Sequence, residues 1–328
     1  MTAPRARFQA ERVGGEADDV IDVTTPWERP PVPLRGVDLY VSFGAAEAEM
    51  WRRTGQELTA GLRRVAARRP LDVDDPARLM RRLARAAAEG DGSAAGALRL
   101  AHERARLVRG AEGRRACARA VVGWLLEEGY RAVVFHESIA AAEEIADSIA
   151  GRGGRAVVDH EQRAPRDRAA DVQRYREGHA RMLVAVRPEE GADRIPPAPV
   201  SVVVSGSRSP RQRLARLEPA GRGVEGHGGL FISILVEGTP EEAFVGGGDA
   251  ALLGAERVAH HRWPVTSVRD ALVRPSSHEP WVGIDSPADL LTASALGVGG
   301  RLPRTAAGAS TRDPGARRYA EAPVEHAG

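Results

Sequence analysis

The spacing of apolar residues changes along this chain, and each change predicts a different kind of element. Residues 37–43 alternate enough to predict a short strand, and apolar positions recur at helical spacing over 45–88 and 98–128. From residue 129 onward, short apolar runs are separated by helical stretches. Strands are predicted at 132–135, 156–158, 182–186, 201–204 and 230–236. Helices are predicted from Ser138 to Ile149 and from Pro165 to Glu177.

The order of these elements predicts the fold class. Apolar runs of four or five residues are typical of strands that are buried on both faces of a parallel sheet. Strands that alternate with helices of this length form βαβ units. We therefore predict an α/β protein in which a parallel sheet carries helices on both faces and is preceded by a helical segment.

Shifts in composition divide the chain into five predicted segments. Residues 1–35 are charged and proline-rich, which predicts an irregular or disordered arm. Residues 36–128 are predicted to be a mainly helical linker segment, and residues 129–245 an α/β domain. Residues 246–295 form a small predicted appendage. Residues 296–328 contain almost no large apolar side chains, so we expect a disordered tail.

Composition limits the function classes. The chain has 328 residues and a formal net charge of +2, and its length predicts one or two domains. Its single cysteine, Cys117, excludes an internal disulfide and a cysteine-based zinc site. No apolar run approaches the roughly 18 residues that span a bilayer, and the first residues lack the apolar core of a signal peptide. We expect a soluble cytoplasmic protein without membrane contact.

Four segments between residues 131 and 242 follow one another in a recognisable order. The first is RAVVFHESIAAAEEIADSI, with Phe135 and His136 at the end of a predicted strand. The second is DHEQRAPRDRAADVQRYREG, the third MLVAVRPEEGADRIPPA and the fourth SGSRSPRQRLARLEPAGR. In this order they resemble motif IV, the stretch that follows it, motif V and motif VI of the C-terminal, second RecA-like domain of superfamily 2 DEAD/DEAH-type helicases.

This resemblance implies a RecA-like domain at 129–245 that forms half of an ATP-dependent DNA or RNA helicase motor. In the family, motif V touches ribose and the nucleic-acid backbone, and motif VI supplies arginines that stabilise charge on the γ-phosphate. The resemblance implies nucleotide-binding roles for Gly191, Asp193 and Arg216, and a catalytic role for Arg222. The nucleic-acid-binding residues that it implies are Phe135, His136, Ser207, Arg208, Arg211 and Arg213.

The fourth segment departs from the family pattern. Motif VI normally reads Gln-Arg-x-Gly-Arg-x-x-Arg, but Ala215, Glu218 and Pro219 replace the glutamine, the glycine and the first finger arginine. A carboxylate at position 218 would repel a triphosphate, and we expect Pro219 to end the helix. Only Arg216 and Arg222 match the pattern.

The third segment can be aligned with motif V in two ways. With one gap on each side, Gly191 and Asp193 match the family's Gly-x-Asp, whereas without gaps these places fall on Ala192 and Arg194.

The sequence contains no lysine, so it cannot contain the Gly-Lys-Ser/Thr of a P-loop. ATP and magnesium would therefore be bound only together with a separate P-loop helicase half, and the chain alone is expected to bind no cofactor and hydrolyse no ATP. The expected partners are DNA or RNA and such a P-loop half.

Other interpretations stay open. The chain can instead be a non-catalytic nucleic-acid- or protein-binding module derived from a helicase, or the remnant of a longer gene. The arginines of the fourth segment can be an ordinary solvated helix face, and His136 and His160 can be structural. No metal site is predicted, because His260 and His261 are adjacent and adjacent residues on a helix do not face one another.

Overall fold

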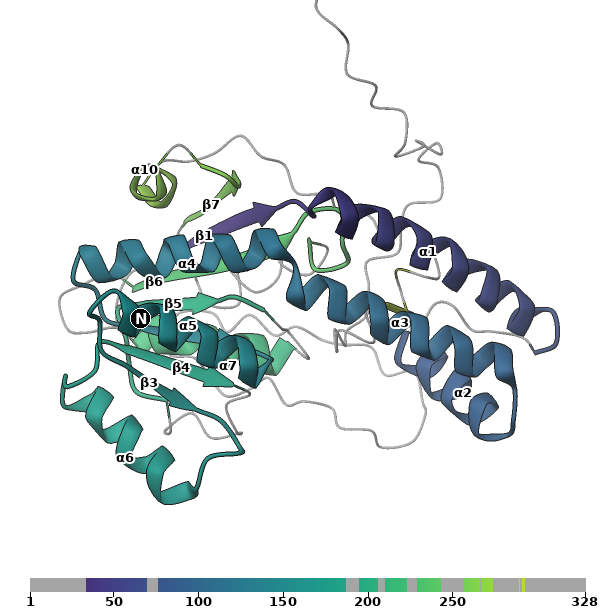
Figure 1. Cartoon of the computed structure of the whole chain (residues 1–328), viewed down its shortest axis with the longest axis horizontal. Helices are drawn as coiled ribbons and strands as arrows, with labels where there is room; N and C mark the ends of the chain where they lie inside the picture. The colour runs from purple at the N-terminus through teal and green to yellow at the C-terminus, as the bar shows by residue number, and fades with distance from the viewer. Residues whose placement is uncertain are drawn as a thin grey trace, which may run out of the picture.

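A seven-stranded sheet in which every strand runs parallel to its neighbours forms the centre of the protein (Figure 1). The computed structural model describes residues 34–69, 76–186, 195–205, 210–222, 229–242, 257–265, 267–273, 289 and 291–292. Within these residues the strand order is β3-β4-β2-β5-β6-β1-β7. The strands are β1 (Leu34–Val41), β2 (Ala132–His136), β3 (Ala156–Asp159), β4 (Met182–Val186), β5 (Val200–Val203), β6 (Gly229–Val236) and β7 (Arg257–Arg262). The predicted α/β fold class with a parallel sheet is confirmed.

Helices cover both faces of the sheet, as predicted. One face is covered by α4 (Glu112–Glu127), α5 (Ile139–Gly151) and the short α10 (Val268–Val273). The other face is covered by α6 (Pro165–Arg176) and α7 (Pro210–Arg222). Every residue of β2 and β4 is buried, because both strands are enclosed between these two helical layers. This burial on both faces explains why their sequences are continuous apolar runs rather than alternating ones.

The sheet extends beyond the range 129–245 predicted for the RecA-like domain. β1 comes from the segment predicted to be a linker, and it pairs with β6 from Leu34 opposite Gly229 to Val41 opposite Val236. β7 comes from the predicted appendage and pairs with the other side of β1. The sequence of β7, RVAHHR, was not predicted to form a strand, because it carries too few apolar residues for the pattern to show. Apart from the beginning of β1, the predicted arm lies outside the described residues, and so does the predicted tail.

Three helices between β1 and α4 form a unit that we call the helical extension, residues 45–69 and 76–110. They are α1 (Ala45–Ala66), α2 (Pro76–Ala88) and α3 (Gly92–Gly110). Most of their inward-facing apolar residues share a core of their own, whereas Ala105 and Val108 near the end of α3 belong to the core on one face of the sheet. Figure 1 shows the extension projecting beyond the end of the sheet, with α3 leading into α4. Each of the two long helical patterns predicted from the sequence is therefore two helices.

The joint between the extension and the sheet lies at Ala111. Its extended backbone (φ −51°, ψ 132°) separates α3 from α4. Glu47, near the start of α1, accepts hydrogen bonds from the backbone N–H groups of Gly44 and Glu112, at 3.0 and 2.9 Å. A side chain at Gly113 would place its Cβ 2.7 Å from the carbonyl oxygen of Ser42. The end of β1 and the start of α4 therefore need a glycine where they meet.

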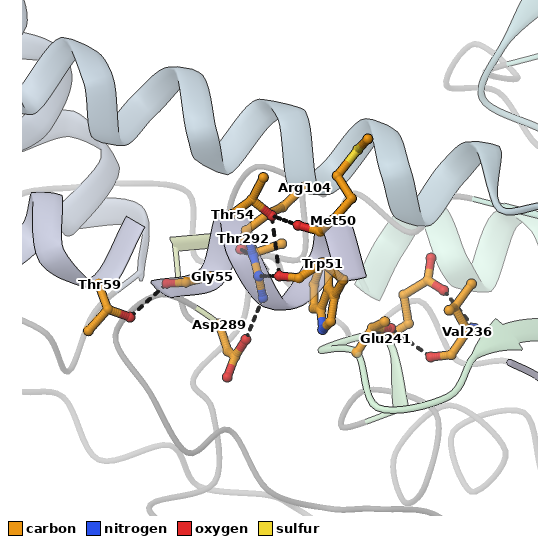
Figure 2. A network of polar contacts seen from close by, with 11 residues as sticks. Met50, Trp51, Thr54, Gly55, Thr59, Arg104, Val236, Glu241, Asp289 and Thr292 are labelled. Atoms are coloured by element: carbon orange, nitrogen blue, oxygen red, sulfur yellow. Dashed lines mark hydrogen bonds and ion pairs between the residues drawn. The ribbon is translucent and has the colours of Figure 1, made fainter. Parts of the chain in front are cut away.

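Arg104 of α3 links the extension to a short segment near residue 290 (Figure 2). Its guanidinium group donates to the carbonyl of Trp51 at 2.6 Å, to Asp289 at 2.9 Å and to the hydroxyl of Thr292 at 2.9 Å. It also stacks 3.4 Å from the centre of the Trp51 ring. Burial lowers the pKa of Arg104 to about 10, and Asp289 opposes this shift. The guanidinium group stays charged near neutral pH and holds α1, α3 and the 289–292 segment together.

None of the described helices is both long enough and apolar enough to cross a membrane.

Candidate functional site at the carboxyl edge of the sheet

Because all seven strands are parallel, the residues that follow them gather at one edge of the sheet, where ligands of open α/β folds usually bind. The motif-like segments found in the sequence contribute to this edge. The described polar residues at or after the strand ends include His136, Glu137, Asp159, His160, Ser205 and Glu237.

A buried carboxylate, that of Glu137, joins α3 of the helical extension to α7 at this edge. Its Oε1 lies 3.4 Å from Nη2 of Arg216 on α7, and its Oε2 lies 3.1 Å from Nε of Arg109 on α3. Arg216 also donates from Nη1 to the carbonyl oxygen of Ser205 at 3.1 Å. The side chains of Glu137 and Arg216 are each only 2% exposed. The carboxylate therefore binds one arginine from the helical extension and one from α7, which covers a face of the sheet.

A second buried ion pair lies nearby. Arg114 of α4 is fully buried and pairs with Glu241, which follows β6. The Oε2 of Glu241 also accepts a hydrogen bond from the backbone N–H of Val236 at 3.3 Å. Figure 2 shows Glu241 folded back onto the end of the strand at Val236. This pair fixes the start of α4 against the end of β6.

His136 is a neutral histidine inside this cluster of charges. Its Nδ1 accepts a hydrogen bond from the backbone N–H of Ser138 at 2.9 Å. Burial, together with the nearby guanidinium groups of Arg114, Arg216 and Arg109, lowers the pKa of His136 to about 3. A proton on this ring would be both desolvated and repelled, so the ring is uncharged at neutral pH.

The polar residues after β3 form a separate set. Asp159 and Arg168 make a buried ion pair of 2.6 Å, and Nε2 of His160 lies 3.4 Å from Glu143 of α5. Arg163 donates to the carbonyl oxygen of Val158 at 3.1 Å. These contacts join α5 and α6 to the end of β3, in keeping with the structural interpretation of His160.

Arg216 and Arg222, the two arginines that match motif VI, both contact protein groups. Arg222 donates to the carbonyl oxygen of Ile195, and its Nε lies 3.5 Å from Glu218. Arg216 is held by Glu137 and Ser205, as described above. The described residues therefore do not fit a triphosphate: the two guanidinium groups bind protein oxygens, and the carboxylate of Glu218 lies beside one of them.

The expectation that Pro219 ends the helix is wrong, because α7 continues to Arg222. Proline removes one hydrogen bond from a helix interior, but only the last turn follows Pro219 here. Carbonyl groups in this turn find partners outside the helix. The oxygen of Pro219 accepts from the backbone N–H of Ala198 at 3.0 Å, and that of Arg216 accepts from the hydroxyl of Ser201.

The predicted nucleic-acid-binding residues occupy different environments. Phe135 is fully buried in the core beneath α6, and His136 is 3% exposed. Neither position favours contact with a nucleic acid, which would require an exposed side chain. Arg211 and Arg213 belong to α7, but their side chains lie outside the described part of the chain, as do Gly191, Asp193, Ser207 and Arg208 entirely. The roles assigned to these residues stay predictions.

Four members of the buried cluster were not predicted from the sequence. Arg109, Arg114, Glu137 and Glu241 come from four separate places in the chain. The only local signal was Glu137, a carboxylate directly after an apolar strand. The arginines carried no signal, because arginine recurs throughout both helical patterns.

His260 and His261 lie on β7 rather than on a helix, so their side chains point to opposite faces of the sheet. Nδ1 of His260 lies 3.1 Å from Oδ2 of the buried Asp38, its neighbour on β1. Burial raises the pKa of the nearby Tyr40, and the carboxylates of Asp38 and Glu242 raise it further. Among the described residues, no group of three or more potential metal ligands is found.

No protein-family model matches the sequence, and no curated protein matches it. Among solved structures, the chain is similar to the Hef helicase domain of Pyrococcus furiosus, with 15% identity and a TM-score of 0.47 over 65% of this chain and 57% of that one. It is similar to a DEAD box protein of Methanococcus jannaschii, with 17% identity and a TM-score of 0.36 over 44% of this chain and 38% of that one. It is also similar to the C-terminal domain of the DEAD-box protein Dbp5, with 18% identity and a TM-score of 0.34 over 38% of this chain and 72% of that one. These are likenesses of fold.

Proposed function

We propose that this chain is a nucleic-acid-binding module built like the C-terminal half of a superfamily 2 helicase, and that it hydrolyses no ATP by itself. The observation that carries the proposal is the position of Arg216. It matches a motif VI arginine in sequence, and from the middle of α7 its guanidinium group points inward to Glu137 at the carboxyl edge. The order of the motif-like segments supports the helicase origin, and the inward arginine supports the loss of ATP chemistry.

Both the sequence and the geometry support the proposed absence of ATP hydrolysis. Without a lysine, the sequence offers no P-loop to hold the β- and γ-phosphates. An arginine finger acts by reaching the developing charge on the transferred phosphoryl group. Arg216 would have to leave Glu137 to do so, and a buried carboxylate would then lose one of its two guanidinium partners. A separate P-loop half would have to bring ATP and magnesium to this edge.

Two measurements on the purified chain test the proposal. Phosphate release from ATP and magnesium, with DNA or RNA present, is expected to equal that of a protein-free blank. Fluorescence anisotropy with labelled DNA and RNA at about 50 mM salt is expected to show binding that weakens steeply as salt is raised, since phosphate contacts release counterions. Turnover that disappears in an Arg216→Ala variant would contradict the ATP half of the proposal. A lack of binding to any nucleic acid would contradict the other half.

A further inference from the structure

The positive charge of the protein is concentrated in the helical extension. The 66 residues from 45 to 110 contain fourteen arginines and nine acidic residues, which gives a formal charge of +5. The whole chain carries +2, so the remaining residues together carry −3. The nine acidic residues include Asp72, Asp74 and Asp75, which precede α2 in the sequence. A near-neutral chain can therefore still present one basic surface, and clustering is the feature that matters for binding a polyanion.

Seven exposed arginines near the junction of α1 and α2 form what we call the arginine face. They are Arg64, Arg68, Arg69, Arg78, Arg81, Arg82 and Arg85. The four on α2 are spaced i, i+3, i+4 and i+7, which places them on one side of the helix. Leu79 and Leu83 of the same helix point the other way, into the core of the extension.

One acidic residue, Glu89, connects an arginine that follows α1 to an arginine of α2. The carboxylate of Glu89 contacts Arg69 after α1 and Arg85 on α2, at 2.5 and 3.0 Å. Arg68 lies 3.8 Å from Asp91. The contacts shared by Glu89 bring the end of α2 beside the residues that follow α1. The arginines in these contacts remain largely exposed, so their guanidinium groups can also reach an anion in solvent.

The surface chemistry favours nucleic acid over a membrane. An amphipathic helix binds a membrane through an exposed apolar face. Among the described residues, the large apolar side chains that are exposed are Met50 and Tyr130. Neither is part of the arginine face, so the described part of this surface offers charge without an exposed apolar side to insert. Planar guanidinium groups also match phosphate oxygens with two parallel hydrogen bonds.

The exposed side chains also favour a duplex over a single strand as the ligand. Proteins that bind single strands stack bases on exposed aromatic rings. The aromatic ring of the extension, Trp51, is covered by Arg104, and the exposed Tyr130 lies after α4. We propose that the arginine face binds the phosphate backbone of double-stranded nucleic acid, a proposal that rests on the nucleic-acid-binding function proposed above and adds its site and its preferred form.

The test compares two variants with equal loss of charge. The first carries Arg64→Gln, Arg81→Gln and Arg85→Gln within the arginine face. The matched control carries Arg115→Gln, Arg155→Gln and Arg166→Gln, three exposed arginines of the sheet and its helices. Both have a formal charge three units below that of the wild type. Binding of a fluorescein-labelled duplex, and of one of its strands alone, is followed by anisotropy between about 50 and 200 mM salt. Circular dichroism checks that each variant keeps its helix content.

Wild type is expected to prefer the duplex. The arginine-face variant is expected to lose at least about tenfold in duplex affinity, with a salt slope smaller by about 2.7, because each lost phosphate contact changes the slope by roughly 0.9. The control variant is expected to change less than about twofold. Equal losses in the two variants, no loss in either, or a preference for the single strand would overturn the arginine face as a duplex site while the proposed function stands.

Two further outcomes concern the proposed function itself and binding to a membrane. If the wild type binds neither duplex nor single strand, the proposed function fails together with this inference. Vesicles containing phosphatidylserine provide the membrane comparison. Binding to them that exceeds duplex binding, and that is lost in the arginine-face variant, would overturn the assignment to nucleic acid.

Discussion

His136 is a neutral histidine surrounded by arginines, and this gives the protein a predicted pH dependence. Its pKa in the folded protein is about 3, well below the value of about 6.5 in an unfolded chain. A lowered pKa means that the unfolded state takes up the proton first. The stabilisation is fully present above about pH 6.5 and is lost as pH falls toward 3. The free energy of unfolding should fall by about 1.4 kcal/mol per pH unit through this window.

Urea unfolding at pH 7.5, 6.5 and 5.5 measures this effect. His136→Asn is the informative variant, because an amide oxygen can replace Nδ1 as acceptor for the Ser138 N–H without a titrating group. The difference in unfolding free energy between pH 6.5 and 5.5 should be smaller in the variant by about 1 kcal/mol. The exposed His179 supplies the control, since His179→Asn should keep the wild-type dependence. The same pH dependence in all three proteins would contradict the buried neutral state.

The elements that meet at the carboxyl edge depend on Glu137. Replacing it with glutamine leaves Arg109 and Arg216 without their shared negative charge. Removing one partner of a buried ion pair costs about 3–5 kcal/mol. Because Arg109 is partly exposed, we expect the lower end, roughly 3 kcal/mol, with a drop of several degrees in the thermal midpoint. Calorimetry of wild type and Glu137→Gln measures the difference.

Glu144→Gln is the matched control for this prediction. Glu144 also pairs with an arginine, Arg119, at 2.9 Å, but both side chains are more than 40% exposed. Exposed pairs contribute little, so this variant should lie within about 1 kcal/mol of wild type. Equal effects of the two substitutions would show that Glu137 does not hold α3 and α7 together.

At the level of elements, the sequence predicted what depends on local pattern. The strands buried on both faces, β2 and β4, appear as apolar runs and were predicted almost to the residue. The break between α3 and α4 was missed because Ala111 is an ordinary helix former, and its extended backbone is set by contacts of Glu47 and Gly113 with neighbouring elements. The strand β7 was missed because its stability comes from pairing with β1 rather than from its own apolar residues.

The candidate site was only partly predictable for a related reason. The motif order located the carboxyl edge and the helix that carries Arg216. It could not show that this guanidinium group faces inward, because its partner Glu137 lies 79 residues away in sequence. Pairings of this kind depend on which strand ends lie side by side. That is decided by the strand order of the sheet, which no local sequence pattern predicts.

For the molecule as a whole, the topology predicts a gradient of stability. The fully buried strands β2 and β4 lie inside the sheet, whereas β7 follows β1 at one end of the strand order, and its described side chains are half-buried or exposed. Backbone amides in enclosed strands exchange only through large-scale opening, whereas those at a poorly buried edge exchange through local opening. Most of the extension packs around its own core, and only the end of α3 packs into the sheet core, so opening of the extension should require less free energy than opening the sheet centre.

Hydrogen exchange followed by mass spectrometry resolves these three regions in the intact chain. We expect the slowest exchange in peptides from β2 and β4, intermediate exchange in α1 and α3, and the fastest exchange in β7. The exchange rates of the extremes should differ by at least about a hundredfold, which corresponds to roughly 2.7 kcal/mol in opening free energy. Glu137→Gln provides an internal check, because it should speed exchange in α7 and at the end of α3 while leaving α2 unchanged. Equal protection of β7 and β2 would mean that the edge strand opens only with the whole sheet, which would contradict the predicted gradient of stability.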